Sequence, residues 1–371
     1  MKKLNITNGM LVAMIVNMIY VKAIGVTQGV LARQIGQDMW IATLLGTLQG
    51  IGILYITHLA MRRTPDLDMI ALGDRLLGKG FGTVVALLIF LFFLAAIGPV
   101  MITFVYHLQD YFLPEAPLSL FIVCALLVGA LGCFYGLEVI ARLALIGCAF
   151  IFLLNVLIVI GSFEEFDIRN LLPVLEQGLP RTLAASLHFD VDCALASMMA
   201  ALVLPMLKSP QKEGGKVGML GIATSGLMVI IWSILEGAVL SAEVTSRYTI
   251  SCMKLARNAH IGEFLQRYEM IMIALYSISA LFQVMFCLYG VSVCTARILR
   301  LKSIRPVILP CCLMLGTLGY WIVKDHFRAI VYLERYWPWV ALPIGFGLPL
   351  VMLGLRLLMG RRLKGEAAAQ R

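Results

Sequence analysis

The chain has 371 residues, of which 61% are hydrophobic and 14% charged, and its formal net charge is +9. A soluble domain is nearer half apolar and a quarter charged, so the composition excludes an ordinary soluble protein. Uninterrupted apolar stretches of about 20 residues are each long enough to cross a bilayer as a helix. They predict an all-α polytopic membrane protein, and the sequence lacks the ten-residue alternation that is typical of a β-barrel.

Ten membrane spans are expected in chain order. The basic start and apolar core of MKKLNITNGMLVAMIV look like a signal peptide, but the apolar run continues past Lys22 without a convincing cleavage site. We therefore interpret it as the first span of a single transmembrane domain over 1–371, which ends in a tail at 359–371. The expected spans are 9–34, 39–60, 81–107, 118–135, 140–161, 188–207, 217–240, 267–296, 306–323 and 337–358.

The basic residues are distributed unevenly between the two sides of these spans. With the N-terminus inside, 19 of the 30 Lys and Arg residues lie on the inner side and 10 on the outer side, and Lys22 lies within the first span. The positive-inside rule then predicts that both termini are cytoplasmic. The positive charge is thus a topology signal together with an attraction to anionic lipid. We expect no nucleic-acid partner.

The ten spans divide into five plus five, at about 9–161 and about 188–358. If these halves are repeats, an odd number of spans inverts the second half, as in many secondary transporters with broken helices at the midplane. The first and sixth spans should then be irregular. The first contains Lys22 and two glycines within 25–29, and the sixth opens with LHFDVD.

Lys22 is a cation in the middle of an apolar run. It lies 13 residues after Gly9, or about 20 Å along a helix, so its stem cannot easily reach either interface. A buried unpaired cation costs about 2.5–3.5 kcal/mol, so we expect a partner: Asp190 or Asp192 first, and Glu236 third. In the alternatives, the first span is shifted and Lys22 reaches the outer headgroups, or Glu236 lies solvated at the outer end of its span.

Other polar residues point to less specific roles. Tyr106 and His107 end the third span, where such a pair is expected to be an interfacial anchor. The nine cysteines form no metal-binding spacing and are interpreted as small apolar residues between helices. We expect no metal and no cofactor, and the absence of HExxH, GxSxG and paired catalytic carboxylates predicts that the chain is not an enzyme.

Six motifs follow one another in a specific order. They are LARQIGQDMW (31–40), LPEAPLSLF (113–121), GLEVIARL (136–143), NLLPVLEQGL (170–179), LVLPML (202–207) and IGEFLQRYE (261–269). In this order the chain resembles the B-subunit permeases of bacterial spore germinant receptors, a branch of the amino acid–polyamine–organocation superfamily. The segment 261–269 matches the family motif I-G-x-F-x-x-R-x-E most specifically.

The resemblance implies a LeuT-like fold of ten helices, with the first and sixth unwound near 21–27 and 188–194. It also implies residence in the spore inner membrane and work beside partner A-type and C-type subunits. The family binds small germinants, typically amino acids such as L-alanine, and the signal leads to germination. This chain departs from the family at Val21-Lys22, at Tyr248-Thr249 and at 189–192, so its ligand can differ from the commonest one.

A broken helix exposes N–H and C=O groups that can bind the two charged ends of an amino acid. An internal lysine would take the place of a coupling ion. We expect the ligand to be bound by Lys22, Ala23, Gly25, Thr27, Phe189, Asp190 and Asp192, with Glu236 as a possible charge partner.

The motif residues have expected structural roles. Glu138 and Arg142 are spaced i,i+4 and should form a local helix pair. Arg267 and Glu269 are two residues apart, so they should point to different faces and hold the outer loop 241–266 against the bundle.

One alternative function stays open, an active proton-coupled secondary amino acid transporter, because it would use the same fold and the same site.

Overall fold

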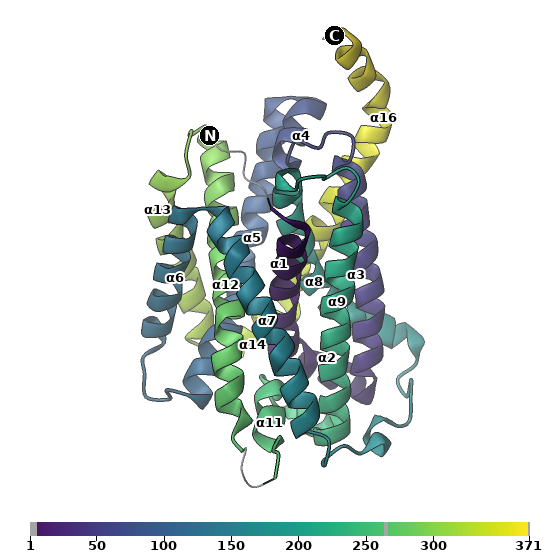
Figure 1. Ribbon diagram of the computed structural model, residues 1–371, viewed down its shortest axis with the longest axis vertical. Coiled ribbons are helices and arrows are strands. Elements are labelled where there is room, and N and C mark those ends of the chain that lie inside the picture. Colours follow the sequence, from purple (N-terminus) through teal and green to yellow (C-terminus); the bar gives the residue numbers. More distant parts are fainter. Residues whose placement is uncertain (1–5, 263–265, 370–371) are drawn as a thin grey trace.

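The computed structural model describes residues 6–262 and 266–369, with side chains described as far as Met359. The described chain is almost entirely helical, and its two ends lie at the same end of an elongated bundle (Figure 1). A common end for both termini requires an even number of crossings, as the sequence predicted.

The described residues contain nine helical stretches that are long and apolar enough to cross a membrane. The crossing segments are α1 (Asn8–Lys22), η1 (Ala23–Thr27), α2 (Gln28–Ile35), α3 (Met39–Met61), α5 (Lys79–Tyr111), α6 (Leu118–Tyr135), α7 (Leu137–Gly161), α8 (Leu179–Val203), η4 (Leu204–Met206), α9 (Gly214–Leu235), η5 (Glu236–Leu240), α12 (Tyr268–Ile298), α13 (Arg305–Val323), α14 (His326–Val331), η6 (Tyr332–Tyr336), α15 (Trp337–Leu342), η7 (Pro343–Gly347) and α16 (Leu348–Ala369). The shorter elements are η2 (Gly36–Asp38), α4 (Met69–Leu77), η3 (Ile168–Leu171), α10 (Ala242–Arg247) and α11 (Ser251–Asn258).

The first of the nine stretches contains two crossings. It runs over 54 residues, Asn8–Met61, which is far more than one bilayer requires. Gly36, the first residue of the 3-10 turn η2, interrupts it with φ +62°, a conformation that favours glycine. The ten predicted spans are therefore all present.

The sixth span begins earlier than the sequence predicted. α8 begins at Leu179 rather than at 188, with Gly178 at φ +80° before it and Pro180 in its first turn, where proline is favoured. The first turns of α8 contain polar residues such as Arg181 and His188, so a search for apolar runs does not detect the start of the helix. As a result Asp190 and Asp192 lie in the middle of a helix and not at its start.

The predicted backbone breaks are only partly present. α8 is continuous through 188–194, so the unwinding predicted there is wrong. The first span does depart from α-helix, but as the π-helical turn η1 over Ala23–Thr27, not as an unwound segment. The acids of α8 are held by side chains of other helices, as described below, so they need no free backbone groups.

α1 and α8 lie inside the bundle, where α1 is buried on all sides from Ala13 to Lys22. They pack against each other, and α1 also packs on α7, α9 and α12. The outward-facing helices α6 and α13 instead expose leucines, as expected of a lipid-facing surface. The centre of the fold is thus the contact between the first and sixth spans.

Candidate ligand-binding site

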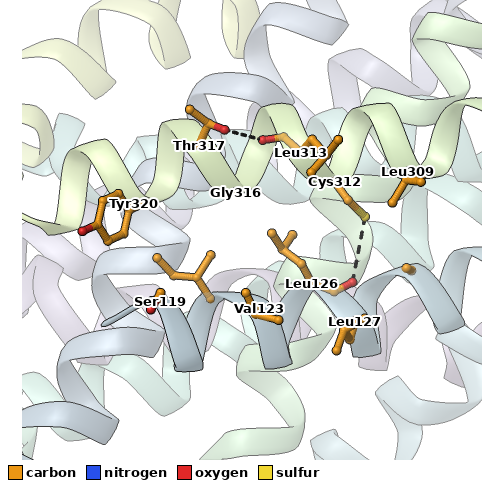
Figure 2. A pocket seen from close by; sticks show the side chains of 12 residues that line it. Ser119, Val123, Leu126, Leu127, Leu309, Cys312, Leu313, Gly316, Thr317 and Tyr320 are labelled. Carbon is orange, nitrogen blue, oxygen red and sulfur yellow. Dashed lines mark hydrogen bonds between the residues drawn. The ribbon is translucent and has the colours of Figure 1, made fainter. Parts of the chain in front are cut away.

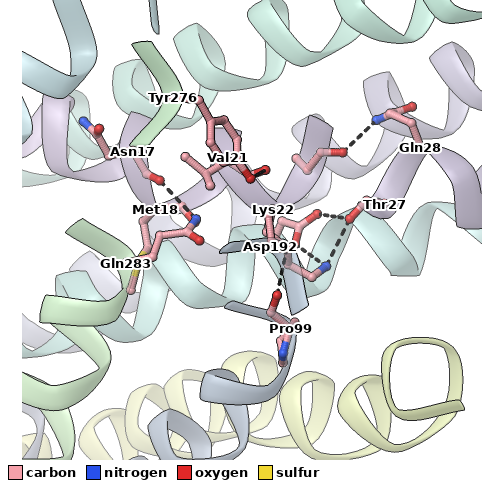
Figure 3. A network of polar contacts seen from close by, with 12 residues as sticks. Asn17, Met18, Val21, Lys22, Thr27, Gln28, Pro99, Asp192, Tyr276 and Gln283 are labelled. Carbon is pink, nitrogen blue, oxygen red and sulfur yellow. Dashed lines mark hydrogen bonds and ion pairs between the residues drawn. The ribbon is translucent and has the colours of Figure 1, made fainter. Parts of the chain in front are cut away.

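The π turn in the first span is the centre of the polar interior (Figure 3). A π turn widens the helix, and such turns are frequent at functional sites. Side chains from α12 donate to carbonyls that precede it: Tyr276 Oη to Val21 O at 3.3 Å, and Gln283 Nε2 to Asn17 O at 3.1 Å and Met18 O at 2.8 Å. These donors stabilise the wide turn from one side.

Lys22 forms an ion pair with the sixth span. Its Nζ lies 2.5 Å from Asp192 Oδ1 and donates to Thr27 Oγ1 at 3.0 Å, and that hydroxyl donates to Asp192 Oδ2 at 2.8 Å. All three residues are buried, and Lys22 is only 3% exposed. The predicted pairing with Asp192 is therefore confirmed, and the alternative in which Lys22 reaches the headgroups is wrong.

A small cavity adjoins this ion pair. The volume of this cavity that the centre of a water molecule can occupy is about 10 Å³, which is close to the minimum needed to hold one water molecule. Its lining consists of Lys22, Val26, Thr27, Val30, His188 and Leu333.

Next to Leu333, Glu334 accepts from Arg33 Nε at 2.9 Å and pairs with its Nη2 at 2.8 Å, which ties α2 to η6. This ion pair lies beside the small cavity, and Lys22 is buried beneath it.

A second cluster surrounds Gly25, and we call it the Gly25 cluster: Gly25, Thr103, His107, Cys252 and Tyr276. A Cβ on Gly25 would lie 2.7 Å from Thr103 Cγ2, 3.2 Å from His107 Cε1 and 3.3 Å from Tyr276 Oη. Glycine is therefore required for this close approach of α5 and α12. The rings of His107 and Tyr276 stack at 4.5 Å, and His107 Nε2 lies 3.3 Å from Cys252 Sγ.

Two of the predicted site residues face a different helix. Phe189 packs on α3, where a Cβ on Gly46 would lie 3.0 Å from its ring. Asp190 also faces α3. When the side-chain amide of Gln49 is oriented with its nitrogen toward Asp190, that nitrogen donates to the two carboxylate oxygens of Asp190 at 3.0 and 2.5 Å. In a continuous helix successive residues are about 100° apart, so Asp190 points nearly away from Asp192. Of the two acids considered as partners of Lys22, Asp192 is the one that faces the first span.

Glu236 is fully buried at the start of η5. Its Oε2 accepts from Ser251 Oγ at 2.5 Å. The solvated position considered for it is wrong, and no ion pair joins it to Lys22 among the residues that the structure describes.

The sequence did not reveal the Gly25 cluster. His107 was expected at an interface, but α5 continues to Tyr111 and His107 is only 1% exposed. One signal was available, because Pro99, Thr103 and His107 follow one another at i,i+4. Thr103 Oγ1 donates to Pro99 O, and His107 Nδ1 lies 2.5 Å from Thr103 O.

The motif residues lie away from both clusters. Glu138 and Arg142 form the predicted exposed i,i+4 pair. Glu269 is buried, and its Oε1 lies 3.6 Å from Arg267 Nε and 3.8 Å from Arg257 Nε.

Arg267 precedes α12 with φ +61°, which turns its side chain back to Glu269, so the expectation of different faces is wrong. The contact with Arg257 of α11 does hold the loop against the bundle. Glu263, Phe264 and Leu265 of the same motif lie outside the described residues.

An apolar groove of about 440 Å³ between α6 and α13 is separate from this polar interior (Figure 2). Its lining carries the hydroxyls of Ser119, Thr317 and Tyr320 and no charge. Leu309 and Leu313 at its rim are more than 60% exposed, so the groove opens outward. It takes no part in the candidate site.

The sequence is similar to known germination proteins. A family model described as "Spore germination protein" matches residues 5–324. Spore germination protein KB of Bacillus subtilis (strain 168) is 25% identical over 314 residues, covering 82% of this chain and 81% of that protein. Spore germination protein A2 of the same organism is 26% identical over 260 residues, covering 68% of each.

Two solved transporters share the fold. One is Mhp1, a nucleobase-cation-symport-1 family transporter in a closed conformation with bromovinylhydantoin bound, with a TM-score of 0.72 at 14% identity over 97% of this chain and 80% of that one. The other is a Na⁺-coupled sialic acid symporter in a substrate-bound outward-open state, with a TM-score of 0.65 at 13% identity over 93% and 78%. These likenesses confirm the predicted LeuT-like fold, and the sequence match shows that the chain belongs to the spore germination protein family.

Proposed function

We propose that this chain is the nutrient-sensing, permease-like subunit of a spore germinant receptor. It binds a small amino acid or a similar polar nutrient at the π turn of the first span. The observation that carries the proposal is the buried polar interior at that turn, with the Lys22–Asp192 pair on one side and the Gly25 cluster on the other. Such isolated polar groups in a membrane interior are typical of a ligand or ion pathway.

Lys22 provides an internal cation for Asp192, which supports sensing without a coupling ion. In our proposal the nutrient contacts Ala23, Gly25 and Thr27 of the first span and Asp192 of the sixth, together with Thr103, His107 and Tyr276. Phe189 and Asp190 shape the site from behind, through α3. Binding favours one arrangement of the two five-span halves, and the partner subunits respond to that shift.

The family supports a proposal for the cellular setting. The subunit works in the spore inner membrane, with both termini in the cytoplasm and with A-type and C-type subunits as partners. The family and its members are named as spore germination proteins, which supports a location in the spore. The larger number of basic residues on the side of the termini supports the orientation.

Substitution of Gly25 tests the position of the site. Gly25→Leu should abolish the nutrient response, and Gly25→Ala should weaken it, because even one methyl group would meet Thr103 Cγ2 at 2.7 Å. Thr103→Ser removes that atom and keeps the hydroxyl, so it should restore the response of Gly25→Ala. The measurement is nutrient-triggered germination of spores, with subunit levels checked by immunoblot.

Gly52→Leu is the matched control, because a Cβ there meets nothing within 4 Å. It should leave germination unchanged. An unaltered nutrient dose dependence in Gly25→Leu spores would show that the pocket lies elsewhere.

The second candidate is an active secondary transporter of amino acids, which we expect to be proton-coupled, because both solved structures with this fold are transporters. Uptake of labelled amino acids into proteoliposomes under a proton gradient separates the two functions. Binding without accumulation supports the sensor, and gradient-driven accumulation supports the transporter.

A further inference from the structure

Glu236 is a buried carboxylate with one oxygen left unpaired. Oε2 accepts from Ser251 Oγ at 2.5 Å, while Oε1 has no hydrogen-bond partner among the described residues. Among the described residues, no Lys, Arg or His lies within 4.0 Å of the Glu236 carboxylate as an ion-pair partner. An unpaired carboxylate is costly in a membrane interior, so a partner for Oε1 is expected.

The other two buried acids of this interior have nitrogen donors of their own. Asp192 has the Lys22 ammonium, and Asp190 has the Gln49 amide. Lys22 already pairs with Asp192, and no other ion pair reaches Glu236 among the described residues. A partner with positive charge would both fill the free oxygen and neutralise the carboxylate.

Glu236 adjoins the Gly25 cluster through α11. Its donor Ser251 begins that helix, and the next residue, Cys252, places Sγ 3.3 Å from His107 Nε2. His107 in turn lies against Gly25, where an added Cβ would be 3.2 Å from its ring. The unpaired oxygen and the proposed nutrient site thus belong to one buried region.

We propose that Glu236 Oε1 binds a protonated primary amine of the nutrient. This rests on the proposed function and narrows its ligand to compounds that carry such an amine, as opposed to neutral sugars or simple carboxylates. An ammonium group offers three N–H donors and a carboxylate only accepts, so the two are complementary. A charge-assisted hydrogen bond of this kind is among the stronger ones.

The test uses the full chain in lipid nanodiscs and measures its unfolding temperature with added probes. The probes are the standard amino acids, the deaminated acid matching each one that binds, the matching amine without its carboxylate, NaCl and KCl. An amino acid that binds should raise the unfolding temperature, and so should its matching amine when added alone. The matching deaminated acid should not raise it. Glu236→Gln keeps an acceptor for Ser251 but loses the charge, and it should weaken amine binding at least about tenfold.

Glu138→Gln, at an exposed carboxylate outside the site, is the matched control and should bind like wild type. Glu236→Asp keeps the charge on a shorter stem, so it should also weaken amine binding, and it decides the matter if Glu236→Gln does not fold.

Unchanged amine binding in the Glu236 variants overturns this inference and leaves the proposed function standing. Stabilisation by NaCl or KCl alone that is lost in Glu236→Gln overturns it in favour of an inorganic cation. A wild-type chain that no amino acid stabilises contradicts the proposed function itself.

Discussion

Lys22 and Asp192 each need the other inside the bundle. Both side chains are buried, and Thr27 bridges them through its hydroxyl. Breaking such a pair by removing one partner is costly because the remaining charge stays buried, whereas removing both charges costs much less. The pair is therefore better suited to fix the relative position of two helices than to add stability of its own.

Lys22→Met should lower the free energy of unfolding by about 3–5 kcal/mol, because it leaves Asp192 unpaired. Adding Asp192→Asn should recover part of this loss. Denaturant unfolding of the purified chain in detergent micelles gives both values.

Arg142→Met is the control for the ion pair, since Arg142 pairs with Glu138 on an exposed surface. Exposed pairs contribute at most about 1 kcal/mol. A Lys22→Met chain as stable as Arg142→Met would contradict a structural role for the buried pair.

The roles of some single residues could be predicted from the sequence, and those of others could not. Lys22 was recognisable because one cation in a long apolar run requires a partner, and Asp192 was among the few candidates. His107 and Tyr276 were not recognisable, because their role depends on how close α5 and α12 approach Gly25, and that distance is set by tertiary packing. The choice between Asp190 and Asp192 stayed open, because it depends on the course of α8, and each position along a helix turns a side chain by about 100°.

Among the elements, the π turn depends on α12 for its hydrogen bonds. Gln283 donates to two carbonyls of α1, and Tyr276 donates to a third. Gln283→Leu should therefore destabilise the chain by about 1–2 kcal/mol, since interhelical hydrogen bonds in membranes contribute roughly 0.6–1.7 kcal/mol each. The same unfolding assay measures the change.

Thr317→Val serves as its control, because that hydroxyl donates within its own helix at an exposed site. It should be close to neutral. Equal stabilities of the two variants would mean that Gln283 does not hold the turn.

Element boundaries could be predicted where hydropathy changes sharply. The sixth and seventh expected spans show both outcomes: 217–240 agrees with Gly214–Leu240, while 188–207 missed the first nine residues of α8. The polar first turns of α8 are helical because Pro180 and the neighbouring bundle favour a helix there, and a search for apolar runs detects neither. The π turn was predicted as an irregularity, but its form depends on donors from distant helices.

At the scale of the whole molecule, the ten crossings place successive loops on alternate sides. The loop after α7 and the loop after α8 should therefore lie on opposite sides of the membrane. In intact cells a membrane-impermeant maleimide should label Glu165→Cys, and Lys212→Cys should be labelled only after permeabilisation.

The chain without either substitution contains nine cysteines, and its labelling gives the background to subtract. The reversed pattern would contradict cytoplasmic termini, and labelling of both sites from the same side would contradict a crossing by α8. The division into repeats at about 9–161 and 188–358 stays a prediction.

The π turn also has a consequence for the phase of the first span. A π turn amounts to one extra residue in a helix, which rotates everything after it by about 100° about the axis. α1 and α2 are therefore two short rods with separate angular settings, one fixed by Lys22 and Asp192 and the other by Arg33 and Glu334. Deleting one residue from 23–27 would restore a uniform helix and swing Arg33 away from Glu334 while Lys22 kept its partner. The extra residue thus sets a fixed phase difference between the two ends of one helix, so that Lys22 and Arg33 each face their own partner.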